Sequence, residues 1–94
     1  MIKIIIERHV AGELIDYYHR ASRNILQMAM QSRGFISGES LKNSDDPNHR
    51  LIIASYDTSS NWSLWYHSDQ RKALMEELRP MLVEDEKITV FEHI

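Results

Sequence analysis

The chain has 94 residues, 43% of them hydrophobic and 27% charged, and this composition is typical of one small globular domain over residues 1–94. The net charge of −3 argues against a nucleic-acid partner, because phosphate binding requires a clustered cationic surface. No apolar run approaches the roughly 20 residues that span a membrane, and the absence of cysteine excludes disulfides and thiolate ligands and fits a cytoplasmic location.

The first predicted element is a β-strand over residues 2–10, IKIIIERHV, in which β-branched residues run up to the bounding AGE. Side chains alternate across a strand, so the three isoleucines at even positions share one face. Ile5, Glu7 and His9 share the other face. Because both faces carry isoleucine, we expect a strand that is covered on both sides.

A helix is predicted over residues 13–31. Its apolar residues, Tyr18 among them, recur every three or four positions and form one broad stripe when placed at about 100° per residue. A weaker apolar stripe, which includes Ile15 and Leu26, lies beside the first. A helix with so broad an apolar surface is expected to contact more than one neighbouring element.

The middle of the chain predicts a β-hairpin over residues 35–57. Gly38 interrupts its first strand, and a glycine at such a position indicates a bulge or a close backbone approach. The turn is expected in SDDPNH, residues 44–49, because Asp, Pro and Asn each favour turns for separate reasons. The run RLIIASYD then forms the returning strand.

The last third of the chain predicts a helical segment over residues 59–83. The segment is expected to break near Ser68 and Asp69, because either residue can cap a new turn. The run EDEK at 84–87 is predicted to be a solvated loop. A closing strand follows in EKITVFEHI, residues 86–94.

The resulting order βαββαβ is that of the ferredoxin-like α+β fold, an antiparallel four-stranded sheet with helices on one face. The uncovered face of this sheet would still carry isoleucine, leucine and valine side chains. An exposed apolar surface of that size marks an interface. The chain is therefore predicted to form a homodimer in which two copies pack through their sheet faces.

Both tryptophans of the chain lie in the stretch NWSLWYHSD, residues 61–69. On a helix, Trp62, Trp65 and Tyr66 fall within about 100° of one another, a spacing that is typical of core packing. An aromatic hollow with a few polar groups is also the usual composition of a small-molecule site, and Asn61 lies beside the same face. We expect Trp65 to face such a pocket and Trp62 to contribute mainly to packing.

Glu7 is unusual because it lies inside a strand that is expected to be covered on both faces. A carboxylate there reaches solvent at the strand end, pairs with a basic neighbour such as Arg8 or Lys3, or has a raised pKa suited to proton transfer. The five histidines show no metal-ligand spacing, so no metal is predicted. The scattered glycines form no phosphate loop, so no nucleotide cofactor is predicted.

Taken in order, GFISGESL, DDPN followed by LIIASYD, NWSLWYHSDQRK and EKITVFE resemble the small antibiotic biosynthesis monooxygenase domain proteins. The resemblance extends over essentially the whole chain. It implies a dimeric α+β barrel, in which two ferredoxin-like subunits join through their sheets and each holds a pocket between sheet and helices. Enzymes of the family oxygenate phenols, hydroquinones or polyketide anthrones with molecular oxygen and use no flavin, haem or metal, and related members bind and degrade haem.

The resemblance also implies roles for particular residues. Some polyketide oxygenases of the family place an asparagine four residues before a tryptophan in the pocket, and Asn61 and Trp65 match that spacing. Trp65 would stack on a flat ring, and Asn61 would bond a substrate oxygen, although the tyrosine and arginine that accompany them have no counterparts here. In the haem-degrading branch, the asparagine of the first strand and the histidine ten residues beyond the tryptophan are replaced here by Glu7 and Met75, so haem degradation is not expected.

Three functional hypotheses follow. The first is a cofactor-independent monooxygenase that oxidises a small electron-rich aromatic, with Glu7 or His9 as the base beside Asn61 and Trp65. The second is a non-catalytic binding or accessory protein with the same pocket, since one fold hosts many functions. The third is haem binding without degradation. The residues expected to form the substrate pocket are Ile5, Tyr18, Trp62, Tyr66 and Met75.

Overall fold

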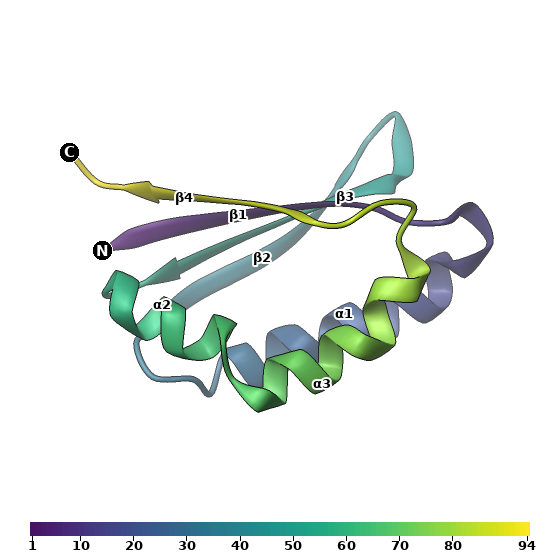
Figure 1. The fold of residues 1–94 in the computed structure, drawn as a ribbon. Helices are drawn as coiled ribbons and strands as arrows, with labels where there is room; N and C mark the ends of the chain where they lie inside the picture. The colour runs from purple at the N-terminus through teal and green to yellow at the C-terminus, as the bar shows by residue number, and fades with distance from the viewer.

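The computed structural model describes residues 1–94, and its main elements follow the order strand, helix, strand, strand, helix, strand. The strands form one sheet in the order β2-β3-β1-β4, and every neighbouring pair is antiparallel (Figure 1). The predicted ferredoxin-like α+β fold is therefore confirmed. The strands are β1 (Ile2–His9), β2 (Phe35–Asn43), β3 (Asp46–Tyr56) and β4 (Lys87–Glu92).

All helical elements lie on one face of the sheet (Figure 1). The predicted break in the second helical segment is confirmed, because the hydroxyl of Ser68 accepts a hydrogen bond from the backbone N–H of Arg71 at 3.1 Å and starts a new helix. None of the helices has the length and apolarity that crossing a bilayer requires. The helical elements are η1 (Gly12–Leu14), α1 (Ile15–Ala29), α2 (Ser59–Tyr66), α3 (Asp69–Leu78) and η2 (Arg79–Met81).

The hydrophobic core lies between the sheet and the helices. Strand β1 runs through the middle of the sheet, and its alternation is as predicted: Ile2, Ile4 and Ile6 are 5%, 0% and 6% exposed. Leu78 of α3 is also 0% exposed. Fully burying one such aliphatic side chain contributes about 1.5–3 kcal/mol, so this layer supplies most of the driving force for folding.

The other face of the sheet has no covering element in the single chain (Figure 1). In the single chain, β1 is therefore covered on the helix side only, and not on both sides as the sequence predicted. Exposed apolar side chains from the two edge strands, Leu41 at 44% and Phe91 at 52%, add to the uncovered surface. The homodimer through this face stays a prediction.

The hairpin turn is shorter than the sequence predicted. Asn43 pairs with Asp46, so Ser44 and Asp45 alone form the turn and the prediction of residues 44–49 is wrong. A register shift between Lys42 and Asn43 places the additional residues, Pro47 among them, within β3 rather than in the loop. The side-chain oxygen of Asn43 accepts the backbone N–H of Asp45 at 2.9 Å and closes the turn.

Gly38 is required by a close approach. A Cβ atom at this position would lie 3.0 Å from both Leu26 Cδ1 and the Phe35 ring, which is too tight for an ordinary contact. The irregularity in β2 lies one step earlier, at the register shift between Phe35 and Ser37. The glycine thus lets α1 pack closely against β2 beside the interior cavity described below.

Candidate substrate pocket

A narrow cavity of about 30 Å³ lies between the inner face of the sheet and the helices. We call it the aromatic cavity, because Phe35, Tyr56, Trp62 and Trp65 form much of its wall. The rings contact one another edge to face: the centroids of Phe35 and Tyr56, and those of Tyr56 and Trp62, are each 5.6 Å apart. Such pairs hold the rings in fixed orientations and make a rigid apolar wall. The lining is completed by Ile6, Arg8, Ile25, Leu26, Ala29, Ile52, Ala54 and Arg71.

Two arginines are buried at the edge of this apolar space. Arg8 follows the three core isoleucines at the next even position of β1, so strand alternation turns it inward, where it is 1% exposed. Arg71 lies in the first turns of α3 and is 5% exposed. Burying a guanidinium is costly unless an anion pairs with it. Both therefore require a partner carboxylate.

Glu86 is that partner. Its two carboxylate oxygens accept one hydrogen bond from Arg8 Nε at 2.8 Å and one from Arg71 NH2 at 2.8 Å. Arg8 also donates to the Tyr18 hydroxyl at 3.3 Å and to Ser22 Oγ at 3.4 Å. Arg8, Arg71 and Glu86 together form what we call the arginine–glutamate cluster.

The arginine–glutamate cluster carries a net positive charge. Burial alone would raise the pKa of Glu86, but the charges and hydrogen bonds of Arg8 and Arg71 hold this pKa below its ordinary value of 4.5. Glu86 is therefore a carboxylate at neutral pH, and two guanidinium groups against one carboxylate leave a charge of +1. This charge lies at the wall of the aromatic cavity.

Tyr56 is a neutral phenol in the same wall. Burial raises its pKa above the ordinary value of 10.0, and this outweighs its hydrogen bond with Ser32 and the nearby charge of Arg71, which both lower it. Its hydroxyl and Ser32 Oγ are 2.7 Å apart. The ring is held rigidly in place and serves as a surface rather than as a proton acceptor.

A wider cleft of about 560 Å³ opens between α1 and the β2–β3 hairpin. Its lining shares Leu26 and Ile52 with the aromatic cavity, so the two spaces are neighbours. We call it the basic cleft, because Arg23, Lys42 and Arg50 line it and no acidic side chain does. Electric fields from one sign of charge focus in such a concave surface and attract anions.

A third depression of about 500 Å³ lies on the other side of Arg71, between α3 and the start of β4. Tyr66 and Met75 line it together with Glu86. The guanidinium carbon of Arg71 lies 4.9 Å from the centre of the Tyr66 ring, a cation–π contact. The arginine–glutamate cluster therefore separates this depression from the aromatic cavity.

The sequence of the chain matches a known family. The family model described as antibiotic biosynthesis monooxygenase matches residues 1–77. The chain belongs to the antibiotic biosynthesis monooxygenase family. Comparison with curated proteins finds no match.

Solved structures share the fold of this chain at low sequence identity. A crystal structure of an antibiotic biosynthesis monooxygenase has a TM-score of 0.91 at 15% identity and covers 100% of this chain and 99% of its own. SnoaB, a cofactor-independent oxygenase from Streptomyces nogalater, has a TM-score of 0.90 at 13% identity and covers 99% of this chain and 92% of its own. Rv0793 from Mycobacterium tuberculosis has a TM-score of 0.89 at 10% identity, with 99% and 94% covered.

Several of the residues that were predicted from the sequence to form the site lie around the interior spaces. Trp65 lines the aromatic cavity, and Trp62 lines it as well rather than only packing beside it. Tyr18 lines the basic cleft and bonds Arg8. Tyr66 and Met75 lie beyond Arg71, and Met75 Sδ is 4.0 Å from Arg8 NH2.

Asn61 does not line the aromatic cavity, in contrast to the role that the monooxygenase resemblance implied. Its side-chain amide donates to Asp57 Oδ1 at 2.9 Å, and this bond lowers the pKa of Asp57. The pair packs over Gly34, which has a φ of 81° and no room for a Cβ atom. Asn61 thus holds the start of α2 against the segment that precedes β2. This contact turns its side chain away from the cavity.

Ile5, Glu7 and His9 lie on the outer face of the sheet, opposite the cavity, because odd positions of β1 point away from the helices. Neither Glu7 nor His9 can therefore act as a base inside the aromatic cavity. The pKa of Glu7 is lowered, not raised, chiefly by its 2.7 Å hydrogen bond with His49 Nε2. Its partner is thus a residue of β3 and not Arg8 or Lys3.

The sequence reasoning missed Arg8, Arg71 and Glu86. The signal for Arg8 was present, because its even position on β1 is the position of the buried isoleucines. The prediction that EDEK is a solvated loop is wrong for Glu86, whose side chain is 11% exposed between two guanidinium groups. Local sequence carried no sign of this, since Glu86 meets Arg8 across 78 residues.

Proposed function

We propose that this family member is a cofactor-independent monooxygenase that oxidises a small, flat, electron-rich aromatic of the hydroquinone or phenol type, bound as its anion. The observation that carries the proposal is the +1 charge of the arginine–glutamate cluster at the wall of a cavity lined by aromatic rings. The family membership and the cofactor-independent oxygenase SnoaB among the structural neighbours support the reaction class.

The chemistry explains why a positive charge matters. Triplet oxygen reacts poorly with closed-shell molecules, so the substrate must be an electron-rich anion that donates the first electron. One atom of O2 then enters the ring as a carbonyl oxygen, and the other leaves as water with two hydrogen atoms from the substrate. At an effective dielectric constant of about 20, two unit charges about 5 Å apart interact by about 3 kcal/mol, enough to lower the pKa of a phenol by about two units.

In this proposal the basic cleft, the aromatic cavity and the arginine–glutamate cluster each carry out a different step. Arg23, Lys42 and Arg50 of the basic cleft attract the anion, and Trp62 and Trp65 stack on its ring and exclude water. The arginine–glutamate cluster stabilises the negative charge in the bound state. A substrate larger than the 30 Å³ cavity is accommodated by the adjoining cleft.

Oxygen uptake by flavin-free, metal-stripped protein tests the proposal. The substrates are a panel of hydroquinones and anthrone-type phenols, with rates corrected for autoxidation. We expect uptake that depends on the protein and a lower kcat/KM for Trp65→Phe, because the smaller ring loses stacking area. Tyr17→Phe is the matched control, since Tyr17 is 58% exposed. Absence of uptake over the whole panel, or equal rates for native protein and Trp65→Phe, contradicts the proposal.

One observation favours the alternative of binding without turnover. No Asp, Glu or His side chain lines the aromatic cavity, so a bound phenol has no general base next to it. Quenching of the fluorescence of Trp62 and Trp65 by a phenol without oxygen consumption would identify a binding protein. The lack of a histidine at the cavity also leaves haem without an imidazole ligand there.

The homodimer belongs to the same proposal. Two copies would pack through the outer face of the sheet, where Leu41 and Phe91 are exposed. Light scattering coupled to size exclusion gives the mass directly, and Phe91→Glu should shift a dimer to the monomer. The cytoplasmic location stays a prediction.

A further inference from the structure

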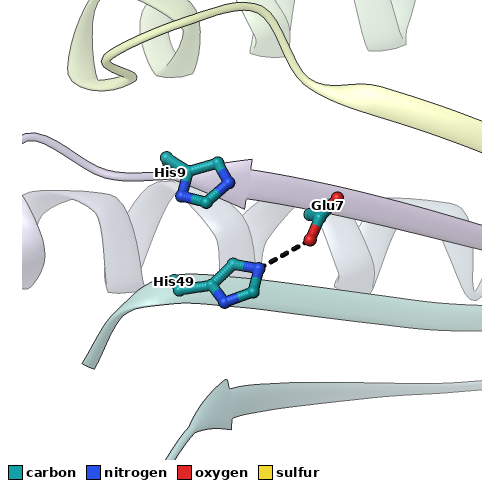
Figure 2. Close-up of side chains that lie close together, drawn as sticks. All are labelled: Glu7, His9 and His49. Atoms are coloured by element: carbon teal, nitrogen blue, oxygen red, sulfur yellow. Dashed lines mark hydrogen bonds and ion pairs between the residues drawn. The ribbon is translucent and has the colours of Figure 1, made fainter. Parts of the chain in front are cut away.

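Three side chains with metal-binding atoms meet on the outer face of the sheet, away from the aromatic cavity (Figure 2). The β1–β3 register places His9 directly opposite His49. Glu7 lies two residues before His9 on the same strand and therefore on the same face. The antiparallel ladder, and not a flexible loop, thus holds the positions of all three residues.

The distances between these groups suit one small cation. The ligand atoms of Glu7, His9 and His49 all lie within 4.8 Å of one another. Glu7 Oε2 and His49 Nε2 are 2.7 Å apart, and the two imidazole rings are stacked with centroids 4.5 Å apart and planes 3° from parallel. Zinc bonds nitrogen and oxygen ligands at about 2.0–2.2 Å, so its ligands lie roughly 3–3.5 Å from each other. Since an imidazole binds a metal in the plane of its ring, the two parallel rings must turn toward a common point when the ion binds.

The chemistry of the donor set selects the kind of ion. Two imidazoles and one carboxylate favour Zn²⁺ and similar first-row divalent transition metals over Ca²⁺ or Mg²⁺, which prefer oxygen ligands alone. In the single chain the side chains are accessible, at 37% exposed for Glu7, 42% for His9 and 27% for His49.

The surroundings support the same geometry. Asn43 Nδ2 donates to His49 Nδ1 at 3.1 Å, so the ring of His49 is oriented from its second nitrogen. Glu84 Oε1 lies 3.9 Å from His9 Nε2 and adds a second carboxylate close to the site. Lys87 pairs with Glu7 across the β1–β4 ladder and is the one cation that opposes a metal there.

We propose that Glu7, His9 and His49 form a binding site for one divalent transition-metal ion of the zinc type on the outer face of the sheet. With three protein ligands, water completes the coordination. The ion links the end of β1 to β3 and lies on the face opposite the aromatic cavity, so it stabilises the sheet and takes no part in the reaction proposed above.

Calorimetric titration of chelator-treated full-length protein with ZnCl2 tests the site. We expect saturable binding of one ion per chain and a higher Tm in its presence. His9→Gln, His49→Gln and Glu7→Gln should each weaken binding by at least about tenfold. The matched control is His67→Gln, because His67 lies on the end of α2, where it bonds only Ser63, and should bind zinc as the native protein does.

A second measurement locates the ion whether or not a variant folds poorly. In the native protein labelled with ¹⁵N-histidine, zinc should shift the ring nitrogen signals of His9 and His49 and leave those of His67 in place. The proposal is overturned by an absence of saturable binding or by a stoichiometry of one ion per two chains. Equal weakening in His67→Gln, or shifts confined to histidines other than His9 and His49, overturns it as well.

Discussion

The substitution Glu86→Gln isolates the contribution of the arginine–glutamate cluster. It is nearly isosteric, so it leaves packing unchanged while it removes the negative charge that Arg8 and Arg71 share at 2.8 Å each. The amide oxygen can still accept one of the two hydrogen bonds, but the amide nitrogen then faces the other guanidinium. Two buried cations are left with no anion between them.

The expected cost follows from the burial of the three side chains, which are 1%, 6% and 11% exposed for Arg8, Arg71 and Glu86. Removing one partner of a buried ion pair costs about 3–5 kcal/mol. Because glutamine keeps one acceptor, we expect the lower end, about 3 kcal/mol of the free energy of unfolding. In a domain of this size, about 3 kcal/mol lowers Tm by roughly 12–24 °C.

Urea unfolding followed by tryptophan fluorescence measures this effect, because Trp62 and Trp65 are both buried and report on the core. The matched control is Glu84→Gln, two residues away with a side chain that is 69% exposed, and it should change the free energy of unfolding by less than about 0.5 kcal/mol. A loss below about 1 kcal/mol for Glu86→Gln, or a loss equal to that of the control, would refute the reasoning that Glu86 neutralises the buried arginines.

Two further predictions follow from the same geometry. The pKa of Glu86 is lower in the folded chain than its ordinary value of 4.5. The stabilisation by the ionised Glu86 is therefore fully present above pH 4.5 and is lost as the pH falls through the folded-state pKa. In urea titrations, the stability difference between native protein and Glu86→Gln should shrink in acid and stay constant above pH 4.5. A difference that grows in acid would contradict this sign. Gly34→Ala forces a Cβ atom to within 2.7 Å of Asn61 Nδ2 at a φ of 81°, so it should lower Tm in a thermal melt, whereas Gly12→Ala, whose nearest neighbour would be 4.0 Å away, should not.

The basic cleft predicts an effect on KM that is separate from stability. Arg23→Gln removes one charge from the basic cleft and should raise KM for an anionic substrate by a factor of about 1.4–5, as expected for a solvent-exposed charge worth about 0.2–1 kcal/mol. Arg33→Gln, which changes the same charge outside that cleft, should leave KM unchanged. If Arg23→Gln and Arg33→Gln change KM by the same factor, at low salt and at high salt alike, attraction of the anion by the cleft is contradicted.

Much of the fold could be predicted from the sequence because it depends on local periodicity. The alternation of Ile2, Ile4 and Ile6, the apolar stripe of α1 and the capping residue Ser68 are each readable within a few positions. The hairpin turn was predicted too long, because the pairing of Asn43 with Asp46 overrides the turn preference of Pro47. The tryptophan stretch at residues 61–69 was singled out from the sequence, and in the structure both Trp62 and Trp65 line the cavity.

Tertiary structure, and not local sequence, brings together the arginine–glutamate cluster on the inner face of the sheet and the three proposed metal ligands on its outer face. Arg8 and Glu86 are 78 residues apart in the chain, and Glu7 and His49 are 42 apart. No local pattern reports such encounters, because they depend on the register in which strands pair and on which face each side chain occupies. Alternation alone placed Arg8 inside and Glu7 outside, but only the pairing of β1 with β3 and with β4 brought their partners Glu86 and His49 to them. The sequence by itself determined the order of elements and the family of this protein, and the strand register decided where its charges meet.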